Sequence, residues 1–440
     1  AVTKDAVLTQ IRERDVKFIR LWFSDILGRL KSFAITSDQV EVILERGVGF
    51  DGSSITGFHA IEESDMVALP DPTTFQILPY RPQEQAVARM FCDIKLPNGA
   101  PYEGDPRYVL RRVMERATSL GFDDFHVAVE PEFFYFCDNT APTPLDRGGY
   151  FDLTTLDAAS DVRRETVIAL EAMGISVASS HHEAGPSQHE IDMHDTSALA
   201  MADNVMTYRT VVKEVAHKHG YYATFMPKPL AGENGNGMHT HQTLLRGGVS
   251  AFDDPADRAG LSDTAKQFIA GQLRHAREMS PVLNQWVNSY KRLVPGFEAP
   301  VYVAWSTRNR SAIIRVPSQH LKDEPTRVEI RCPDPACNPY LSFAVLLAAG
   351  LDGIENGYEL PAQLEPNLYD LRTDERHRVG IEALPESLGE AVEVGAESEL
   401  LLRTLGEHIH ARLCEIKRRE WNEYRTQVTA YEIDRDLPTM

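Results

Sequence analysis

The stretch HVAVEPEFFYF, residues 126–136, mixes β-branched and aromatic side chains with two carboxylates, Glu130 and Glu132. This composition predicts a β-strand. Side chains two positions apart on a strand point to the same face of the sheet. Apolar residues flank both glutamates, so a solvated run of charges explains them poorly, and like charges this close need a compensating cation. On its own the motif is weak evidence for a metal site, so other ligands have to come from elsewhere in the sequence.

Two further segments place acidic side chains where they can converge. In HHEAGPSQHE, Glu183 and Glu190 bracket a Gly-Pro loop, which can bend both carboxylates toward one point. In RVEIRCPDP, Glu329 and Arg331 alternate along a predicted strand and therefore share a face. One of these two side chains can bind a cation while the other binds an anion beside it.

The segment ENGNGMHTHQ joins a turn to a strand. Residues 234–237 form a permissive Asn-Gly-Asn-Gly turn, whose backbone can approach a ligand closely. His239 and His241 alternate on the strand that follows, so they share a face. A histidine is more often a packed residue than a ligand, and for this pair the sequence leaves both alternatives open.

A cluster of arginines stands out in a protein that is otherwise acidic. Arginine side chains hold carboxylates and phosphates through forked hydrogen bonds, and the alternative here is a set of surface ion pairs. The cluster consists of Arg292, Arg308, Arg310 and Arg315.

The acidic segments together supply the ligands of a metal site. Oxygen ligands with one imidazole suit Mg²⁺ or Mn²⁺ better than a structural zinc ion. The candidate ligands are Glu130, Glu132, Glu183, Glu190, His239 and Glu329. With the arginines they describe a two-metal site for phosphoryl transfer. The sequence contains no GxxxxGK[ST] loop and no GxGxxG fingerprint, so nucleotide binding needs another architecture.

The composition is that of a globular protein, and its charge restricts the partners. The 440 residues include 45 Lys and Arg against 65 Asp and Glu, a net charge of −20. A surface this acidic argues against nucleic acid or an anionic membrane as the main partner. Five cysteines without a CxxC pair indicate a reducing, cytoplasmic environment. We expect neither a signal peptide nor a membrane-spanning helix, because no apolar run approaches the ~20 residues that cross a bilayer.

Helix and strand patterns divide the chain near residue 100, in a stretch rich in proline and glycine. Before this point we expect a small α+β unit, and beyond it helices alternate with strands. The predicted elements are a helix within residues 1–15, strands at 16–23 and 29–35, a helix at 106–121, a buried helix at 338–357 and an amphipathic helix at 401–421.

Seven segments in order resemble type I glutamine synthetases, and the resemblance runs almost end to end. They are FDGSSITGF, EPEFF, HHEAGPSQHE, MPKPLAGENGNGMHTH, YKRLVPGFEAPV, RNRSAIIRVP and VEIRCPDPACNPYL. The resemblance implies an α+β fold with a β-grasp domain over residues 1–100 and a catalytic domain over residues 101–440, where an antiparallel sheet forms a funnel with helices around it. It also implies a dodecamer of two hexameric rings, with active sites between neighbouring subunits.

The resemblance implies a reaction as well. ATP phosphorylates the side-chain carboxylate of L-glutamate, and ammonia then displaces phosphate from the γ-glutamyl phosphate. The metal ligands fall into two sites. One site matches Glu132, Glu183 and Glu190, and the other, against the ATP phosphates, matches Glu130, His239 and Glu329.

The remaining roles are also carried over by position. Residues matching the nucleotide site are Arg310 and Arg315 at the phosphates, with His241, Thr243 and Arg327 around the nucleotide. Residues matching the glutamate site are Asn234, Gly235, Arg292 and Arg331.

Four positions match the chemistry of ammonium. Asp51 corresponds to the carboxylate that deprotonates ammonium, reached from the adjacent subunit, while Ser54 and Tyr150 line its pocket. Glu298 matches the flap glutamate that closes the site. A flap is expected because γ-glutamyl phosphate hydrolyses readily and water has to be excluded. We also count Arg310 among the predicted catalytic residues, because arginines offset negative charge on the transferring phosphoryl group.

The chain departs from the family pattern at three positions. Ala178 stands where a glutamate that contacts the nucleotide is common, and Ala60 stands where one subgroup has an arginine linked to glutamine feedback inhibition. Tyr369 matches the tyrosine that is adenylylated in the other subgroup. The insertion typical of that subgroup is missing between Phe136 and Tyr150. We therefore place the chain with the alpha-type subgroup and expect Tyr369 to be packed rather than modified.

Two other functions fit parts of this pattern. A ligase of the same fold that joins glutamate to an organic amine or polyamine would keep the metal and ATP residues and differ in the amine pocket. A catalytically inactive structural relative would have lost metal ligands, and all six are present here. The sequence leaves open the preferred amine, the mode of regulation, the choice between Mg²⁺ and Mn²⁺, and whether the assembly is a dodecamer or a hexamer.

Overall fold

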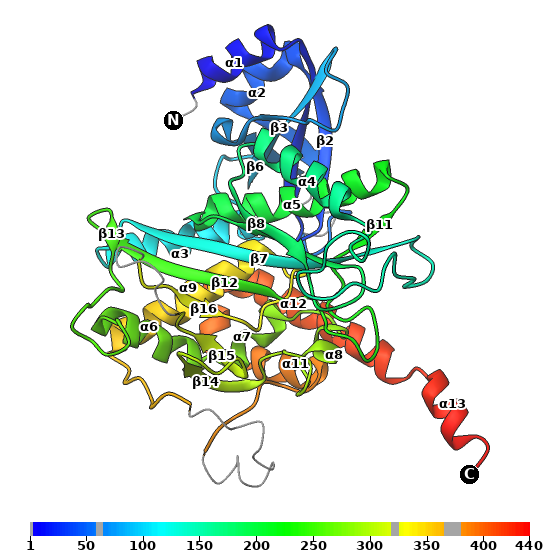
Figure 1. The fold of residues 1–440 in the computed structure, drawn as a ribbon. Coiled ribbons are helices and arrows are strands. Elements are labelled where there is room, and N and C mark those ends of the chain that lie inside the picture. Colours follow the sequence, from blue (N-terminus) through cyan, green and yellow to red (C-terminus); the bar gives the residue numbers. More distant parts are fainter. Residues whose placement is uncertain (1–2, 59–64, 318–324, 365–379) are drawn as a thin grey trace.

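Two sheets of different size organise the chain, and helices pack on both (Figure 1). The computed structural model describes residues 3–58, 65–317, 325–364 and 380–440. The expectations for Ala60 and Tyr369 lie outside the described residues.

The smaller sheet belongs to the N-terminal part of the chain. Its described strands follow the order β2-β1-β6-β4-β3, with β5 paired to β6. They are β1 (Val16–Ser24), β2 (Leu30–Thr36), β3 (Val48–Asp51), β4 (Asp65–Pro70), β5 (Gln76–Ile77) and β6 (Ala86–Lys95). The predicted hairpin of β1 and β2 is confirmed, and β6 runs parallel to β1. The helical elements among the described residues here are α1 (Lys4–Glu13), α2 (Val40–Arg46) and two short 3-10 helices, Ser37–Gln39 and Pro72–Thr74.

The larger sheet carries the acidic motifs. Its described strands follow the order β14-β15-β16-β12-β7-β9-β8, while β10 and β11 pair with β7 and β13 pairs with β12. They are β7 (Asp124–Phe136), β8 (Val177–His182), β9 (Gln188–Met193), β10 (Thr196–Ser197), β11 (Tyr222–Thr224), β12 (Met238–Arg246), β13 (Val249–Ser250), β14 (Tyr302–Ser306), β15 (Ala312–Arg315) and β16 (Val328–Ile330). The expected antiparallel arrangement holds for every described pair except β14 with β15, which is parallel.

Helices pack beside the larger sheet, and Figure 1 shows α9 beside its strands. They are α3 (Pro106–Ser119), α4 (Ser160–Ala172), α5 (Ala198–Lys218), α6 (Asp263–Arg274), α7 (Ala276–Leu283), α8 (Ser289–Arg292), α9 (Pro339–Asn356), α11 (Leu388–Ala396) and α12 (Glu399–Arg425). Helix α13 (Ala430–Asp436) has no buried residue and projects away from the rest of the chain in Figure 1. The helices predicted near both ends are confirmed. The last of them, α12, is longer than predicted and is kinked at Gly406. In the part of the chain that the structure describes, no helix combines the length and apolar character needed to cross a bilayer.

The buried helix α9 crosses α6 at unusually close range. A Cβ atom on Gly271 would lie 2.1 Å from the carbonyl oxygen of Ala349, and one on Gly353 would lie 2.0 Å from that of Gln267. Only residues without a side chain allow the two backbones to approach this closely. These glycines therefore set the distance between the two helices.

The N-terminus of α9 joins the two parts of the chain. The side chain of Asn338 caps the helix by accepting hydrogen bonds from the backbone N–H groups of Tyr340 and Leu341. Its amide also donates to the carbonyl oxygens of Asp25 and Ile26, which lie in the turn between β1 and β2. One buried side chain thus fastens the N-terminal hairpin to the central helix. The division of the chain into domains near residue 100 stays a prediction.

We expect Asn338→Ala to lower the thermal unfolding midpoint more than an ordinary cap mutation does. The variant loses a helix cap and leaves two buried carbonyl groups without their donor, at a combined cost of about 2–4 kcal/mol. Ser387→Ala is the matched control, because Ser387 caps α11 through one hydrogen bond to the N–H of Glu390, and it should cost about 1 kcal/mol. Calorimetry of both variants measures the difference, and equal midpoints would contradict the proposed role of Asn338.

Candidate active site

The first acidic cluster forms across strands β7, β12 and β16. The register pairs His239 of β12 with Glu130 of β7, and His241 of β12 with Glu329 of β16. Glu130 contacts both histidines, with its oxygens 3.2 Å from His239 Nδ1 and 2.7 Å from His241 Nε2. Glu329 lies 3.5 Å from His239 Nδ1. Glu130, His239 and Glu329 therefore offer three ligand atoms within 4.8 Å of one another.

Positive groups already compensate part of the charge in this cluster. Glu329 is fully buried, and it accepts hydrogen bonds from the guanidinium groups of Arg331, at 2.6 Å, and Arg315. Burial by itself raises the pKa of Glu329, but His239 and the arginines hold that pKa below its usual range. Burial and Arg331 lower the pKa of His239, so its neutral ring is available as a ligand.

Two buried atoms beside this cluster lack a hydrogen-bond partner among the described residues. They are Nδ1 of His241 and Nε of Arg331. Unsatisfied buried polar atoms are rare and costly, so each calls for an explanation such as a ligand. Both fit a site that is completed by a bound anion and cation.

The second cluster lies one step along β7. Strand pairing places Glu132 directly opposite Glu190 of β9, and the turn between β8 and β9 brings Glu183 to the same place. Burial raises the pKa of Glu132 to about 7. Burial and the charge of Glu132 raise the pKa of Glu183 to about 8 and that of Glu190 well above its usual range. Three acids crowded this way favour a divalent cation among them.

A histidine that the sequence did not single out also belongs to this cluster. His181 Nε2 lies 3.3 Å from Glu190 and its Nδ1 lies 3.6 Å from Glu183. The only signal for it was its place in the HHEAGPSQHE segment, where the two glutamates took precedence. Its ring packs edge-on against the stacked rings of Tyr150 and Phe151, so it connects the acidic cluster to Tyr150.

A buried ion pair between Asp146 and His182 holds the turn that carries Glu183 in place. Asp146 accepts hydrogen bonds from His182 Nε2, at 3.0 Å, and from the backbone N–H of Ser187, at 2.8 Å. His182 Nδ1 donates to the carbonyl oxygen of Glu183 at 2.7 Å. Although burial raises its pKa, these hydrogen bonds hold the pKa of Asp146 well below its usual range. Residue spacing did not reveal this pair, because its members are distant along the chain.

Asp146 and His182 also lie near His189, and the three could be taken for another metal site. The hydrogen-bond pattern argues against this interpretation. Arg163 can only donate, and its guanidinium lies 2.8 Å from His189 Nδ1, so that nitrogen accepts and the proton sits on Nε2. Both nitrogens of His182 are also engaged. This group therefore supports the turn rather than binding a metal.

The residues predicted to bind the substrate glutamate lie close together beside the second cluster. Arg292 is buried, and its guanidinium donates to the carbonyl oxygens of Cys332 and Arg331. A Cβ atom on Gly235 would lie 2.3 Å from the carbonyl oxygen of Pro227 and 3.0 Å from the Arg292 side chain, so only glycine fits there.

The loop before β12 also reaches the predicted flap. The amide of Asn234 donates to Glu298 at 3.3 Å. Burial and the charges of Glu132 and Glu298 raise the pKa of Glu183. Glu298 therefore lies near the second cluster.

The other predicted residues lie at the margin of this site or away from it. Thr243 is buried on β12, whereas Arg310 and Arg327 are exposed. Tyr150 is 58% exposed, and burial and the charge of Glu183 raise its pKa. Ala178 is exposed on β8.

Two predicted residues lie in the N-terminal part. Asp51 ends β3 and accepts a hydrogen bond from the N–H of Ser53, and Ser54 follows in the next turn. In Figure 1, β3 is separated in the view from β12 and β16 by β8, α4 and α5. Within one chain the structure does not bring Asp51 and Ser54 together with the acidic clusters.

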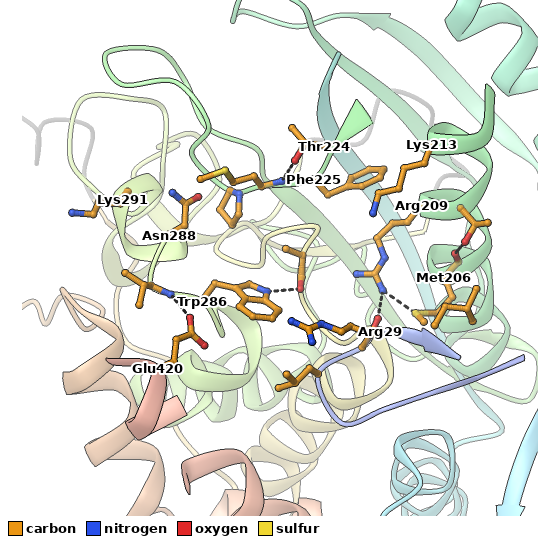
Figure 2. A pocket seen from close by; sticks show the side chains of 18 of the residues that line it. Arg29, Met206, Arg209, Lys213, Thr224, Phe225, Trp286, Asn288, Lys291 and Glu420 are labelled. Atoms are coloured by element: carbon orange, nitrogen blue, oxygen red, sulfur yellow. Dashed lines mark hydrogen bonds between the residues drawn. The ribbon is translucent and has the colours of Figure 1, made fainter. Parts of the chain in front are cut away.

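A cavity of about 950 Å³ opens behind residues 225–237, which we name the glutamate loop, and none of the predicted metal ligands lines it. Figure 2 shows Asn288 and Lys291 on one side of it and Arg209 and Lys213 on the other. Met226 and Pro227, which precede the Asn-Gly-Asn-Gly turn, form part of its wall. The cavity is therefore distinct from the acidic site but shares a loop with it.

Two family descriptions match nearly the whole chain. "Glutamine synthetase, beta-Grasp domain" matches residues 15–97, and "Glutamine synthetase, catalytic domain" matches residues 103–436. The chain belongs to the glutamine synthetase family.

Relatives and a solved structure agree with this assignment. A glutamine synthetase of Mycolicibacterium smegmatis is 52% identical, and the match covers 98% of both chains. One of Methanosarcina mazei is 50% identical over 99% of this chain and 98% of the relative. A solved structure described as a complex of GmaS with ADP is 32% identical, with a TM-score of 0.88 over 98% of this chain and 99% of the other.

We expect added Mn²⁺ to raise the melting temperature more at pH 8 than at pH 6. Because the pKa values of Glu132 and Glu183 are raised to about 7 and about 8, the metal-free folded protein binds more protons than the unfolded chain between about pH 5 and pH 8. Its stability therefore falls as the pH rises through this window, and a bound cation takes the place of the lost protons.

Glu183→Gln should reduce this pH dependence of the metal effect. Glu115→Gln, which changes an exposed glutamate on α3, should leave the dependence unchanged. Differential scanning calorimetry with and without the ion measures both. A metal-induced shift of equal size at pH 6 and pH 8 in the unmutated protein would contradict the assignment of this cluster.

Proposed function

We propose that the two acidic clusters hold two divalent cations, Mg²⁺ or Mn²⁺, in an enzyme that makes glutamine. The chain is a glutamate–ammonia ligase, which forms glutamine, ADP and phosphate from L-glutamate, ammonia and ATP. The observation that supports the metal proposal best is that Glu130 and Glu132, two positions apart on one strand, lie beside two different sets of candidate ligands. When bound, such cations offset charge on the transferring phosphoryl group.

The first site is formed by Glu130, His239 and Glu329, and the second by Glu132, Glu183 and Glu190. We assign the first to the ATP phosphates, because Arg315, which we assign to the phosphates, donates a hydrogen bond to Glu329. The remaining residues that we assign to the nucleotide are His241, Thr243, Arg310 and Arg327. The solved GmaS structure is described as a complex of that protein with ADP, which supports a nucleotide site in a chain of this fold.

The glutamate substrate is assigned to the pocket beside the second site. Asn234, Gly235, Arg292 and Arg331 would hold its charged groups, and the absence of a side chain at Gly235 leaves the backbone free to approach it. Arg310 offsets charge on the phosphoryl group in transfer. A bound glutamate would give Arg331 Nε the acceptor that it lacks among the described residues.

Ammonium would enter a small anionic pocket formed by Asp51, Glu183 and Glu298, with Ser54 and Tyr150 in its wall. The negative charge attracts the cation, and Asp51 then removes a proton so that the neutral amine can attack. We assign Asp51 and Ser54 to an adjacent subunit, because their strand lies apart from the acidic clusters of the same chain.

This arrangement requires an oligomer, and we propose a dodecamer of two hexameric rings. We also propose a β-grasp domain over residues 1–100 and a catalytic domain over residues 101–440. One hydrophobic cluster is confined to residues between Val7 and Tyr102, which supports the division, whereas Trp22, Ile26 and Phe91 pack into the main core with residues of the catalytic part. A cytoplasmic location is supported by the five cysteines, all of which are free. Neither nucleic acid nor a membrane is a proposed partner, given the net charge of −20.

Ammonium should be preferred over organic amines as the acceptor. An alkylamine replaces at least one N–H donor with an apolar group and leaves a pocket acceptor unpaired, which costs about 1–3 kcal/mol in transition-state binding. The test compares kcat/KM for ammonium, methylamine, ethanolamine and putrescine at equal free-base concentration. A tenfold preference for any organic amine would replace the glutamine synthetase assignment with that of an amine ligase.

Activity should be partly restored when two inactive variants are mixed. Asp51→Ala and Glu329→Ala remove residues from different parts of the chain, so dissociation and random reassembly should leave about a quarter of the shared sites intact. Mixing Glu190→Ala with Glu329→Ala is the control, because both residues belong to the same subunit's site and no intact site can form. Absence of recovery in properly reassembled Asp51→Ala and Glu329→Ala oligomers would contradict a shared site.

A further inference from the structure

A contact between a lysine and an aromatic ring joins the flap to the glutamate loop. The ammonium group of Lys228 lies 3.8 Å from the centroid of the Phe297 ring. Phe297 directly precedes Glu298, the proposed flap residue. A cation this close to the face of an aromatic ring is attracted by the ring's quadrupole, and partial burial strengthens the attraction. Both side chains are half-buried, so the contact is not an ordinary surface pair.

The segment around Phe297 has few other attachments among the described residues. Gly296 and Glu298 both have positive φ angles, +98° and +56°, which describe a sharp turn that only glycine adopts without cost. Two side-chain contacts hold this turn against the glutamate loop. One is Lys228 with Phe297, and the other is Asn234 with Glu298 at 3.3 Å.

Lys228 itself is held firmly at its backbone. Its N–H donates to the side-chain oxygen of Asn288 at 2.7 Å, and the amide of Asn288 donates back to the Lys228 carbonyl at 3.1 Å. The ammonium group also donates to the carbonyl oxygen of Glu233. Figure 2 shows Asn288 at the edge of the cavity behind this loop. The aromatic ring therefore rests on a fixed cation rather than on a mobile surface lysine.

The same loop is tied to the turn that carries the second acidic cluster. Asn236 donates from its N–H to the carbonyl oxygen of Pro227 at 2.8 Å, and the side chain of Gln188 donates to Asn236 at 3.0 Å. Gln188 begins β9, two residues before Glu190. Lys228 is thus linked through a short chain of hydrogen bonds to the acids that surround the reacting group.

We propose that Lys228 is a positioning residue that keeps the flap turn at residues 296–298 closed over the γ-glutamyl phosphate, through its contact with Phe297. This inference rests on the proposed role of Glu298 in closing the site. Lys228 takes no part in the bond changes, so it is not a catalytic residue. Its effect is to lower the fraction of time during which water can reach the intermediate.

Two reactions compete for that intermediate. Ammonia attacks the γ-carbon, a C–N bond forms, the bond from carbon to the phosphate oxygen breaks, the nitrogen gives one proton to the departing phosphate, and glutamine and phosphate leave. If water attacks instead, a C–O bond forms at the same carbon, and the products are glutamate and phosphate. Hydrolysis consumes ATP without making glutamine, so the ratio of phosphate to glutamine measures how well the flap excludes water.

We expect Lys228→Gln to raise the ratio of phosphate to glutamine, with a larger excess at limiting ammonium. Loss of a contact of this kind should raise the ratio of open to closed flap about two- to fivefold. Phe297→Leu should have the same effect, whereas Lys228→Arg and Phe297→Tyr should keep the ratio of the unmutated enzyme, since both retain a cation and an aromatic ring. The assay follows phosphate and glutamine together in the intact oligomer with its metal, ATP and L-glutamate.

Lys291→Gln is the matched control. Lys291 also lies over an aromatic ring, with 5.3 Å from its ammonium group to the centroid of Tyr424, and it is exposed beside the cavity in Figure 2. Its variant should leave the ratio unchanged. If Lys228→Gln fails to fold, as judged by its melting temperature, Phe297→Leu decides the question.

The outcomes separate the role of Lys228 from the proposed function. Equal phosphate and glutamine in folded Lys228→Gln or Phe297→Leu, with an unmutated enzyme that makes glutamine normally, would overturn the role of Lys228 alone. An unmutated enzyme that makes no glutamine from ammonium, or a Glu298→Gln variant with unchanged kinetics and ratio, would overturn the proposed function on which the inference rests. A raised ratio in both Lys228→Gln and Phe297→Leu, but not in Lys291→Gln, supports the contact.

Discussion

Three glutamates that share one buried corner cannot all carry a negative charge unless a cation lies among them. Strand pairing places Glu132 directly opposite Glu190, and the preceding turn adds Glu183, so the fold forces this conflict. Burial and the repulsion among these acids raise their pKa values, since protonation is the only other way to remove the charge. Much of the surrounding structure serves to keep the three groups together in spite of their repulsion.

In the neighbouring cluster, positively charged and imidazole side chains compensate the charge of the acids. Glu130 and Glu329 face His239, His241 and the guanidinium groups of Arg315 and Arg331, and their pKa values lie below the usual range in spite of burial. The two halves of the site therefore differ before any ligand binds. The cluster with Glu130 and Glu329 is already ionised and can accept a further cation together with anionic phosphates. The cluster with Glu132, Glu183 and Glu190 needs a cation before all its carboxyl groups can ionise.

Support for the acidic cluster comes from residues that never touch the reacting groups. Asp146 and His182 fasten the turn that carries Glu183, and Gln188 ties that turn to the glutamate loop at Asn236. The loop in turn contacts the flap through Asn234 and Lys228. The proposed metal ligands, the proposed glutamate loop and the proposed flap are thus joined by a continuous set of hydrogen bonds and packed side chains. Such a network lets the reacting groups be positioned by parts of the chain that are distant in sequence.

The sequence by itself determined the family and the main secondary structure. It also proposed candidate ligands for both clusters. Alternation along strands showed that Glu130 and Glu132, and His239 and His241, share a face, and the family resemblance divided the ligands between two sites. It pointed to the glutamate loop because the Asn-Gly-Asn-Gly turn at residues 234–237 lets the backbone approach a ligand and matches the family pattern.

Only the tertiary structure decided how these groups are compensated and held. The register of β7 against β9 and β12 assigns each acid its neighbours, and a shift of one residue would have turned them to the opposite face. His181 shares its segment with Glu183 and Glu190, but spacing alone did not show that its ring lies against both of them. The pair of Asp146 with His182 and the contact of Lys228 with Phe297 could not be found from spacing, because their partners come from separate segments. The parallel pair of β14 and β15 and the kink at Gly406 also depend on packing. Residue types along a chain define which chemistry is possible, but the energies of charges and hydrogen bonds depend on distances and burial that only the folded chain sets.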